Sequence, residues 1–181
     1  MTLDNMLGRG LERAASGRNE ITRYLTKIRR KIADSRKDSI SLDSRFDIAF
    51  EALLQISLAA IRANGYRTTS EAGHQRLAIQ LLPKSIGVDP AEIRVLDEYR
   101  KQRSIGLYEA DFDPSEAEVK AVTAAVGGLL EKFVNWISSN RPEWIEEVER
   151  PRKPVQVIDK RLGKTPPAAP ASRPTKPGRR R

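Results

Sequence analysis

Few residues of this chain could do covalent chemistry. Cysteine is absent and His74 is the only histidine, which excludes disulfides, thiol nucleophiles and iron–sulfur clusters and leaves too little for a zinc site. The sequence also has no glycine-rich phosphate loop and no nucleophile elbow. We therefore expect no metal and no cofactor. What remains is charge: Lys and Arg side chains that can hold phosphate.

The basic residues gather at the C-terminus. Of the 181 residues, the segment 150–181 holds 11 Lys and Arg, a single acid and seven of the 11 prolines, so its net charge is +10 against −1 for residues 1–149. With so little apolar material it cannot bury enough surface to fold. We predict a helical domain over 1–149 and a disordered Pro/Arg/Lys-rich tail over 150–181. The tail ends in Arg179, Arg180 and Arg181 and is expected to bind nucleic acid or an acidic partner, unless it only solubilises the protein.

Residues 1–149 carry helix signals throughout and no run of alternating strand residues, which predicts an all-α fold. The clearest helix runs from about Leu42 to Asn64, with Ser41 as its cap and Gly65 after its end. Other helices are expected over about Leu3–Ser16, Arg18–Ala33, Ser70–Leu82, Pro90–Leu107 and Pro114–Ser139, and a short segment at Pro142–Val148 is expected to close one end of the bundle with Trp144.

Local charges give further expectations. Asp89-Pro90 and Asp113-Pro114 should each provide a capping Asp followed by a proline at the first helical position. Arg29, Arg30 and Lys31 lie near the C-terminal end of their helix, where they complement the helix dipole.

Arg100 and Arg103 share one helical stripe with apolar residues. This would place the aliphatic parts of their side chains beside the core or a dimer interface. Taken by themselves, these arginines are expected to pair with Asp97, Glu98 or Glu109 and to hold a helix or dimer contact.

Three stretches carry a family resemblance: SLDSRFDIAFEALLQISLAAIRANGYR, EAGHQ, and IRVLDEYRKQRSIGLYEADFDPSEAE. Together they resemble a bacterial branch of the HEPN family, the higher-eukaryote and prokaryote nucleotide-binding domains. The resemblance implies an up-and-down helical bundle, usually a homodimer, with its signature facing a cleft between protomers. Many members are metal-independent endoribonucleases of toxin–antitoxin, antiphage or stress systems, and others only bind nucleotides or RNA.

The resemblance also implies a site. The family pattern is an Arg followed by a His five to seven positions on; Arg103 matches the Arg, Ser104 stands at a frequent Asn position, and Tyr108 stands where the nearest His would be. Arg103 and Arg100 would then hold phosphate. RNA cleavage without metal needs a group that can take up a proton. A tyrosine with a pKa near 10 is a poor base at pH 7, because only about one phenol in a thousand is ionised there.

His74 matches a Gly-His position of the same branch and is the residue that could replace the missing acid or base. A lone histidine at the start of a helix is otherwise a surface or capping residue.

Three functions follow as hypotheses. The first is a cytoplasmic HEPN-like homodimer that binds nucleic acid or nucleotides in a toxin–antitoxin, defence or regulatory system, with catalysis lost or altered. The second is a metal-independent endoribonuclease that uses Arg103 with His74 or Tyr108. The third is a dimerisation module whose tail recruits a partner. An antitoxin, or a nucleotidyltransferase that modifies Tyr108, is a further possible partner, and no membrane contact is expected.

Overall fold

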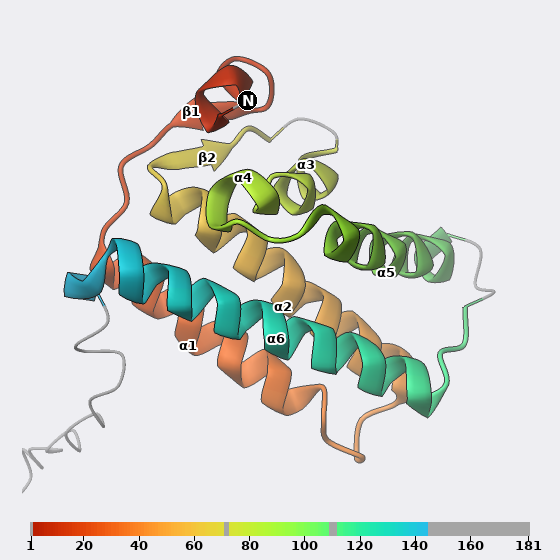
Figure 1. Ribbon diagram of the computed structural model, residues 1–181. Helices are drawn as coiled ribbons and strands as arrows, with labels where there is room; N and C mark the ends of the chain where they lie inside the picture. Colours follow the sequence, from red (N-terminus) through yellow and green to blue (C-terminus); the bar gives the residue numbers. More distant parts are fainter. Residues whose placement is uncertain (1, 71–72, 109–111, 145–181) are drawn as a thin grey trace, which may run out of the picture. The chain divides into compact units, whose positions relative to one another are not determined.

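The computed structural model describes residues 2–70, 73–108 and 112–144, without the side chains of 107 and 108. Segment 150–181, the predicted domain boundary at Glu149, and Arg179, Arg180 and Arg181 lie outside the described residues. The helices are α1 (Arg18–Asp34), α2 (Leu42–Ala63), α3 (His74–Gln80), α4 (Leu82–Ile86), α5 (Pro90–Tyr108) and α6 (Glu116–Asn140); the strands are β1 (Leu11–Arg13) and β2 (Tyr66–Thr68); the 3-10 turns are η1 (Leu3–Met6) and η2 (Pro142–Trp144) (Figure 1). The predicted all-α fold is confirmed, apart from this small sheet.

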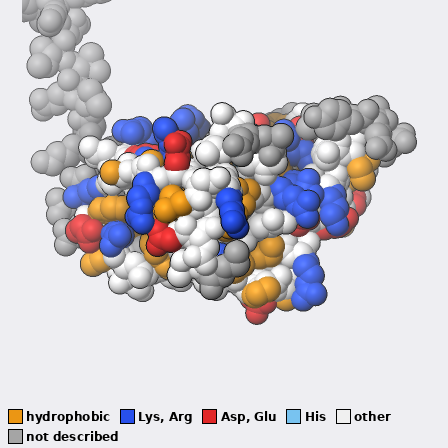
Figure 2. Space-filling model, turned by 90° about the horizontal axis from the view of Figure 1, so that it is seen from above, with side chains coloured by type: hydrophobic (Ala, Val, Ile, Leu, Met, Phe, Trp, Pro, Cys, Tyr) orange, Lys and Arg blue, Asp and Glu red, His pale blue; other side chains and the backbone are white. Residues whose placement is uncertain are grey.

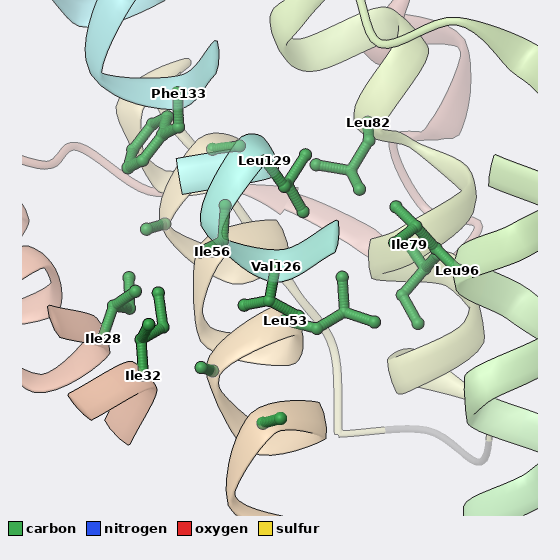
Figure 3. Close-up of a cluster of buried hydrophobic side chains, with 14 of the residues drawn as sticks. Ile28, Ile32, Leu53, Ile56, Ile79, Leu82, Leu96, Val126, Leu129 and Phe133 are labelled. Atoms are coloured by element: carbon green, nitrogen blue, oxygen red, sulfur yellow. The ribbon is translucent and has the colours of Figure 1, made fainter. Parts of the chain in front are cut away.

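The central element is α2, whose small residues Ala49, Ala52, Ala59 and Ala60 are fully buried and allow neighbouring helices to approach closely. Helices α1 and α6 pack along it, and α3, α4 and α5 cover its other side (Figure 1). Side chains from all six helices converge on one apolar core (Figure 3). The predicted Leu42–Asn64 helix is thus confirmed as the core helix, and Gly65 ends it with a positive φ of 86°.

The predicted N-terminal helix Leu3–Ser16 is wrong, and so is the expectation that no strand exists. After the short η1 turn, β1 pairs antiparallel with β2, with Leu11 opposite Thr68. Gly8 and Gly10 have φ angles of 69° and 94°, a left-handed conformation that breaks a helix and suits glycine.

The predicted helix Ser70–Leu82 is shorter than expected: α3 covers only His74–Gln80, and a second short helix, α4, follows it. Helix α3 ends before Leu81, and Pro83 lies in the first turn of α4, where its missing N–H costs no helical hydrogen bond. The next start is confirmed: α5 begins at Pro90, and the Asp89 carboxylate accepts a hydrogen bond from the backbone N–H of Ala91 at 2.6 Å.

The start of α6 differs from the prediction by two residues. Ser115, rather than Asp113, is the capping residue: its hydroxyl accepts from the Glu118 N–H at 3.3 Å, and the Glu118 carboxylate accepts from the Ser115 N–H at 2.8 Å. This reciprocal pair is a capping box. At the other end of α6, Trp144 packs against the core beside α1 and α6, as expected for a residue that closes the bundle.

Candidate nucleic-acid interface

Arg100, a predicted phosphate ligand, is held by its own helix. Its Nε donates a hydrogen bond to the Asp97 carboxylate at 2.7 Å, and this bond holds the pKa of Asp97 below its ordinary value. The prediction of an Arg100–Asp97 pair is confirmed. The guanidinium charge is therefore largely satisfied within α5.

Arg103, the residue that matches the family arginine, is held by α2. Its Nε lies 3.2 Å from an Asp47 carboxylate oxygen, and its guanidinium carbon lies 5.1 Å from the centre of the Phe50 ring. The Arg103 side chain is only 20% exposed. Its Nε is buried and has no partner in hydrogen-bond geometry among the described residues. Sequence reasoning missed Asp47, although this residue belongs to the quoted stretch that contains Arg45 and Phe46.

The other predicted catalytic residues lie on α3 and at the end of α5. His74 is the first residue of α3, follows Gly73, and is half-buried. Helix α3 packs against α5, and Arg76 of α3 adds its charge to the environment of Asp97. Tyr108 ends α5, and its side chain lies outside the described part of the structure. A role for His74 or Tyr108 in proton transfer thus stays a prediction.

The face of the molecule around α3, α4 and α5 mixes its charges. Viewed from that side, Lys and Arg side chains stand in separate groups with acidic and apolar side chains between them (Figure 2). Lys101, for example, pairs with Glu98 at 3.0 Å. A continuous basic surface is not visible in this view.

The outward side of α1 carries a set of cations, of which the sequence interpretation considered only Arg29 and Arg30 and assigned them to the helix dipole. Ile21, Leu25, Ile28 and Ile32 are buried. Arg23, Lys27 and Arg30 recur at four- and three-residue spacing on the opposite side, Arg29 lies about 100° around the helix from Arg30, and all four are exposed. We call these four residues the α1 basic face. Within the described residues, no carboxylate lies at ion-pair distance from any of them.

The two acidic residues of α1 do not neutralise this face, because each is bound elsewhere. Glu20 accepts hydrogen bonds from Arg62 of α2 at 2.6 and 2.8 Å, which lower the pKa of Glu20. Asp34 pairs with Lys37 at 2.6 Å. Arg23 and Arg30 still lie close enough to help lower the pKa values of Glu20 and Asp34, so these two acids offset part of the charge of the α1 basic face.

A cavity of about 660 Å³ lies where the α1–α2 loop meets the start of α6. Its main charged group is Arg45, which is 5% exposed. The Arg45 guanidinium donates to both carboxylate oxygens of Glu116 at 2.9 and 3.2 Å, and its Nε donates to the Ser35 carbonyl at 2.9 Å. These partners use all three nitrogens, so this cluster joins elements together rather than presenting a free cation.

The described residues offer neither a metal site nor a membrane-spanning helix. Over 2–70, 73–108 and 112–144, no group of His, Asp and Glu side chains is arranged to hold a metal ion. Nor does any helix in these ranges combine the length and apolar character needed to cross a membrane.

Comparison with known proteins adds no relative. No family model matches the chain, and neither the curated proteins nor the solved structures contain a significant match. The likeness to the HEPN family therefore stays a resemblance of short sequence stretches.

Proposed function

We propose that this chain is a HEPN-like protein that binds nucleic acid through the α1 basic face. The observation that carries the proposal is the set of four exposed cations on α1 without a carboxylate partner among the described residues. Arg100 and Arg103, which the resemblance implied as phosphate ligands, take structural roles in this proposal. The toxin–antitoxin, defence or regulatory setting rests on the resemblance alone.

The spacing of the cations suits a phosphate backbone. Arg23 and Arg30 are seven residues apart, which corresponds to about 10.5 Å along a helix. One strand of a duplex advances about 3.4 Å per phosphate, so the stripe spans about three phosphates.

The position of the last described residue supports the same surface. Trp144 packs beside α1, so the chain leaves the described part of the structure next to the basic helix. The sequence then continues into segment 150–181 with its net charge of +10. In this proposal the segment adds salt-dependent affinity to that of the α1 basic face.

A homodimer is part of the proposal, and α5 is the surface that favours it. Among the residues whose side chains the structure describes, Val95 and Ile105 are the exposed large hydrophobic side chains, at 49% and 42%. They lie equally far from residue 100, so an antiparallel pairing of α5 with its copy would set Val95 of one chain against Ile105 of the other. Light scattering on the full chain tests this, and a monomer at all concentrations contradicts it.

The endoribonuclease is the second candidate, and one contact favours it. Helix α3, which begins with His74, packs against α5, which carries Arg103. Cleavage of RNA in EDTA that is lost in both His74→Ala and Arg103→Ala would support catalysis. Binding without cleavage would support the first proposal.

The test of the first proposal compares two triple variants of the full chain. Arg23→Ala/Lys27→Ala/Arg30→Ala removes three charges from α1. Lys84→Ala/Arg94→Ala/Lys101→Ala removes three exposed charges from α4 and α5 and serves as the matched control. Binding of labelled RNA is measured by fluorescence anisotropy at several salt concentrations, in EDTA.

We expect the α1 variant to bind at least tenfold more weakly at 50 mM salt. The slope of the logarithm of the binding constant against the logarithm of the salt concentration should be flatter by about 2, because each lost phosphate contact removes about 0.7 to 0.9 from this slope. The control should change affinity less than threefold. Equal losses in the two variants would show that only net charge matters and would contradict the proposal, as would an absence of salt-dependent binding by the unaltered chain.

A further inference from the structure

A second cavity lies directly beneath the α1 basic face. It has a volume of about 440 Å³ and is formed between α1 and α2 by Glu20, Arg23, Tyr24, Lys27, Gln55 and Leu58. Two of its wall residues, Arg23 and Lys27, belong to the α1 basic face. A ligand in this cavity would therefore sit beside any phosphate held by that face.

Gln55 supplies an unsatisfied polar atom in this cavity wall. Its side-chain oxygen is buried and has no hydrogen-bond partner among the described residues. Buried polar atoms are normally paired, and an unpaired one is unfavourable. Rotation of the Gln55 side chain toward the cavity would expose this oxygen, which could then accept a hydrogen bond from an N–H group of a ligand.

Tyr24 and Leu58 supply the apolar part of the wall. Tyr24 packs against the main core and is half-buried, and burial together with the charge of Glu20 raises the pKa of its phenol. The ring is therefore neutral at physiological pH. Glu20, the acidic residue of the wall, accepts its hydrogen bonds from Arg62, and Arg23 interacts with it only through its charge.

We propose that this cavity accepts one unpaired base of a single-stranded nucleic acid. The base would stack on Tyr24, donate an N–H to the Gln55 oxygen, and place its flanking phosphates against Arg23 and Lys27. This inference rests on the proposed function, and it adds a preference for single strands, whose bases are free to leave the stack. A free nucleotide offers the same base and phosphate chemistry, and the test separates the two.

The experiment compares an RNA oligonucleotide with an oligonucleotide of equal length that lacks all bases. Both carry the same phosphates, so their difference in affinity reports contacts with bases. The full chain is tested unaltered and as Gln55→Leu, Tyr24→Leu and Tyr24→Phe. Gln102→Leu is the matched control, because the Gln102 side-chain oxygen is also buried and unpaired but lies on α5.

We expect the unaltered chain to prefer the natural oligonucleotide by about tenfold or more, since base stacking on an aromatic side chain is worth about 1–3 kcal/mol. This preference should fall below threefold in Gln55→Leu and Tyr24→Leu. It should persist in Gln102→Leu and in Tyr24→Phe, which keeps the ring. Thermal melts should show Gln55→Leu as stable as the unaltered chain, because the substitution removes an unpaired polar atom.

The outcomes separate the two proposals. Salt-dependent binding that is lost in the α1 triple variant, with an unchanged preference in Gln55→Leu and Tyr24→Leu, would overturn the base pocket and leave the proposed function intact. No salt-dependent binding of either oligonucleotide would overturn both. If 1 mM mononucleotide displaces the RNA completely, the site takes free nucleotides, and the single-strand proposal is overturned.

Discussion

Arg103 illustrates what one sequence can and cannot say about a single residue. Its position on a half-buried stripe of a helix was predictable from periodicity, and the structure bears this out. Its partners, Asp47 and Phe50, lie on another helix, and no local pattern connects them to α5. Arg45 and Glu116 form a second such pair: Glu116 is the first residue of α6, and its carboxylate binds the buried Arg45 guanidinium of α2.

The pairing of Glu20 with Arg62 makes a prediction about pH. Because the hydrogen bonds from Arg62 lower the pKa of Glu20 in the folded state, the pair stabilises the fold above the ordinary value of 4.5. The stabilisation is lost as the pH falls through the lowered folded-state value. Glu20→Gln should therefore reduce the free energy of unfolding by about 1.5 kcal/mol at pH 7, and the difference should vanish in acid.

Urea unfolding at a series of pH values measures this effect. Glu12→Gln is the control, since the pair of Glu12 with Arg67 joins two well-exposed side chains and is worth less than about 0.5 kcal/mol. A difference between Glu20→Gln and the unaltered chain that grows toward low pH would contradict the assignment.

At the scale of elements, long helices were predictable and short ones were not. Helices α1, α2, α5 and α6 contain several turns, so their apolar periodicity and flanking Gly, Pro and Asp residues define them. Strands β1 and β2 have three residues each, too few to establish an alternating pattern. The α1 basic face was present in the sequence, but its lack of partners depends on Glu20 and Asp34 being bound by Arg62 and Lys37, which only the fold reveals.

The start of α6 gives a prediction that separates the observed cap from the one expected from sequence. Ser115→Ala removes the hydroxyl that accepts from the Glu118 N–H and should lower the free energy of unfolding by about 1 kcal/mol. Asp113→Ala should have a smaller effect, because Asp113 lies outside the capping box. Chemical denaturation of the two variants measures the difference, and a larger loss in Asp113→Ala would restore the sequence-based assignment.

At the scale of the whole molecule, charge is divided between a nearly neutral domain and a strongly basic C-terminal segment. Deletion of residues 150–181 should leave the thermal unfolding midpoint of the domain unchanged, because the sequence of that segment holds too little apolar material to add to a core. RNA affinity should fall and the salt slope should become flatter, since fewer counterions are released on binding.

Calorimetry and anisotropy on the two chain lengths check this expectation. The shortened chain should still lose affinity when Arg23, Lys27 and Arg30 are replaced, because α1 contributes separately. A shortened chain whose binding is insensitive to that replacement would assign all nucleic-acid contact to the C-terminal segment.

The small sheet has a consequence for how the molecule opens. An apolar cluster separate from the main core lies beside the sheet and consists of Leu3, Leu11, Ile61, Tyr66, Ala78 and Leu81. The N-terminal residues are joined to the rest of the domain by the pairing of β1 with β2 and by hydrogen bonds from Arg62 to the Ala14 and Ala15 carbonyls. This cluster has far fewer buried residues than the main core, so the N-terminal segment should open at a lower free energy than α2 and α6. Its backbone amides should exchange with deuterium well before those of the central helix, as an independent cooperative unit.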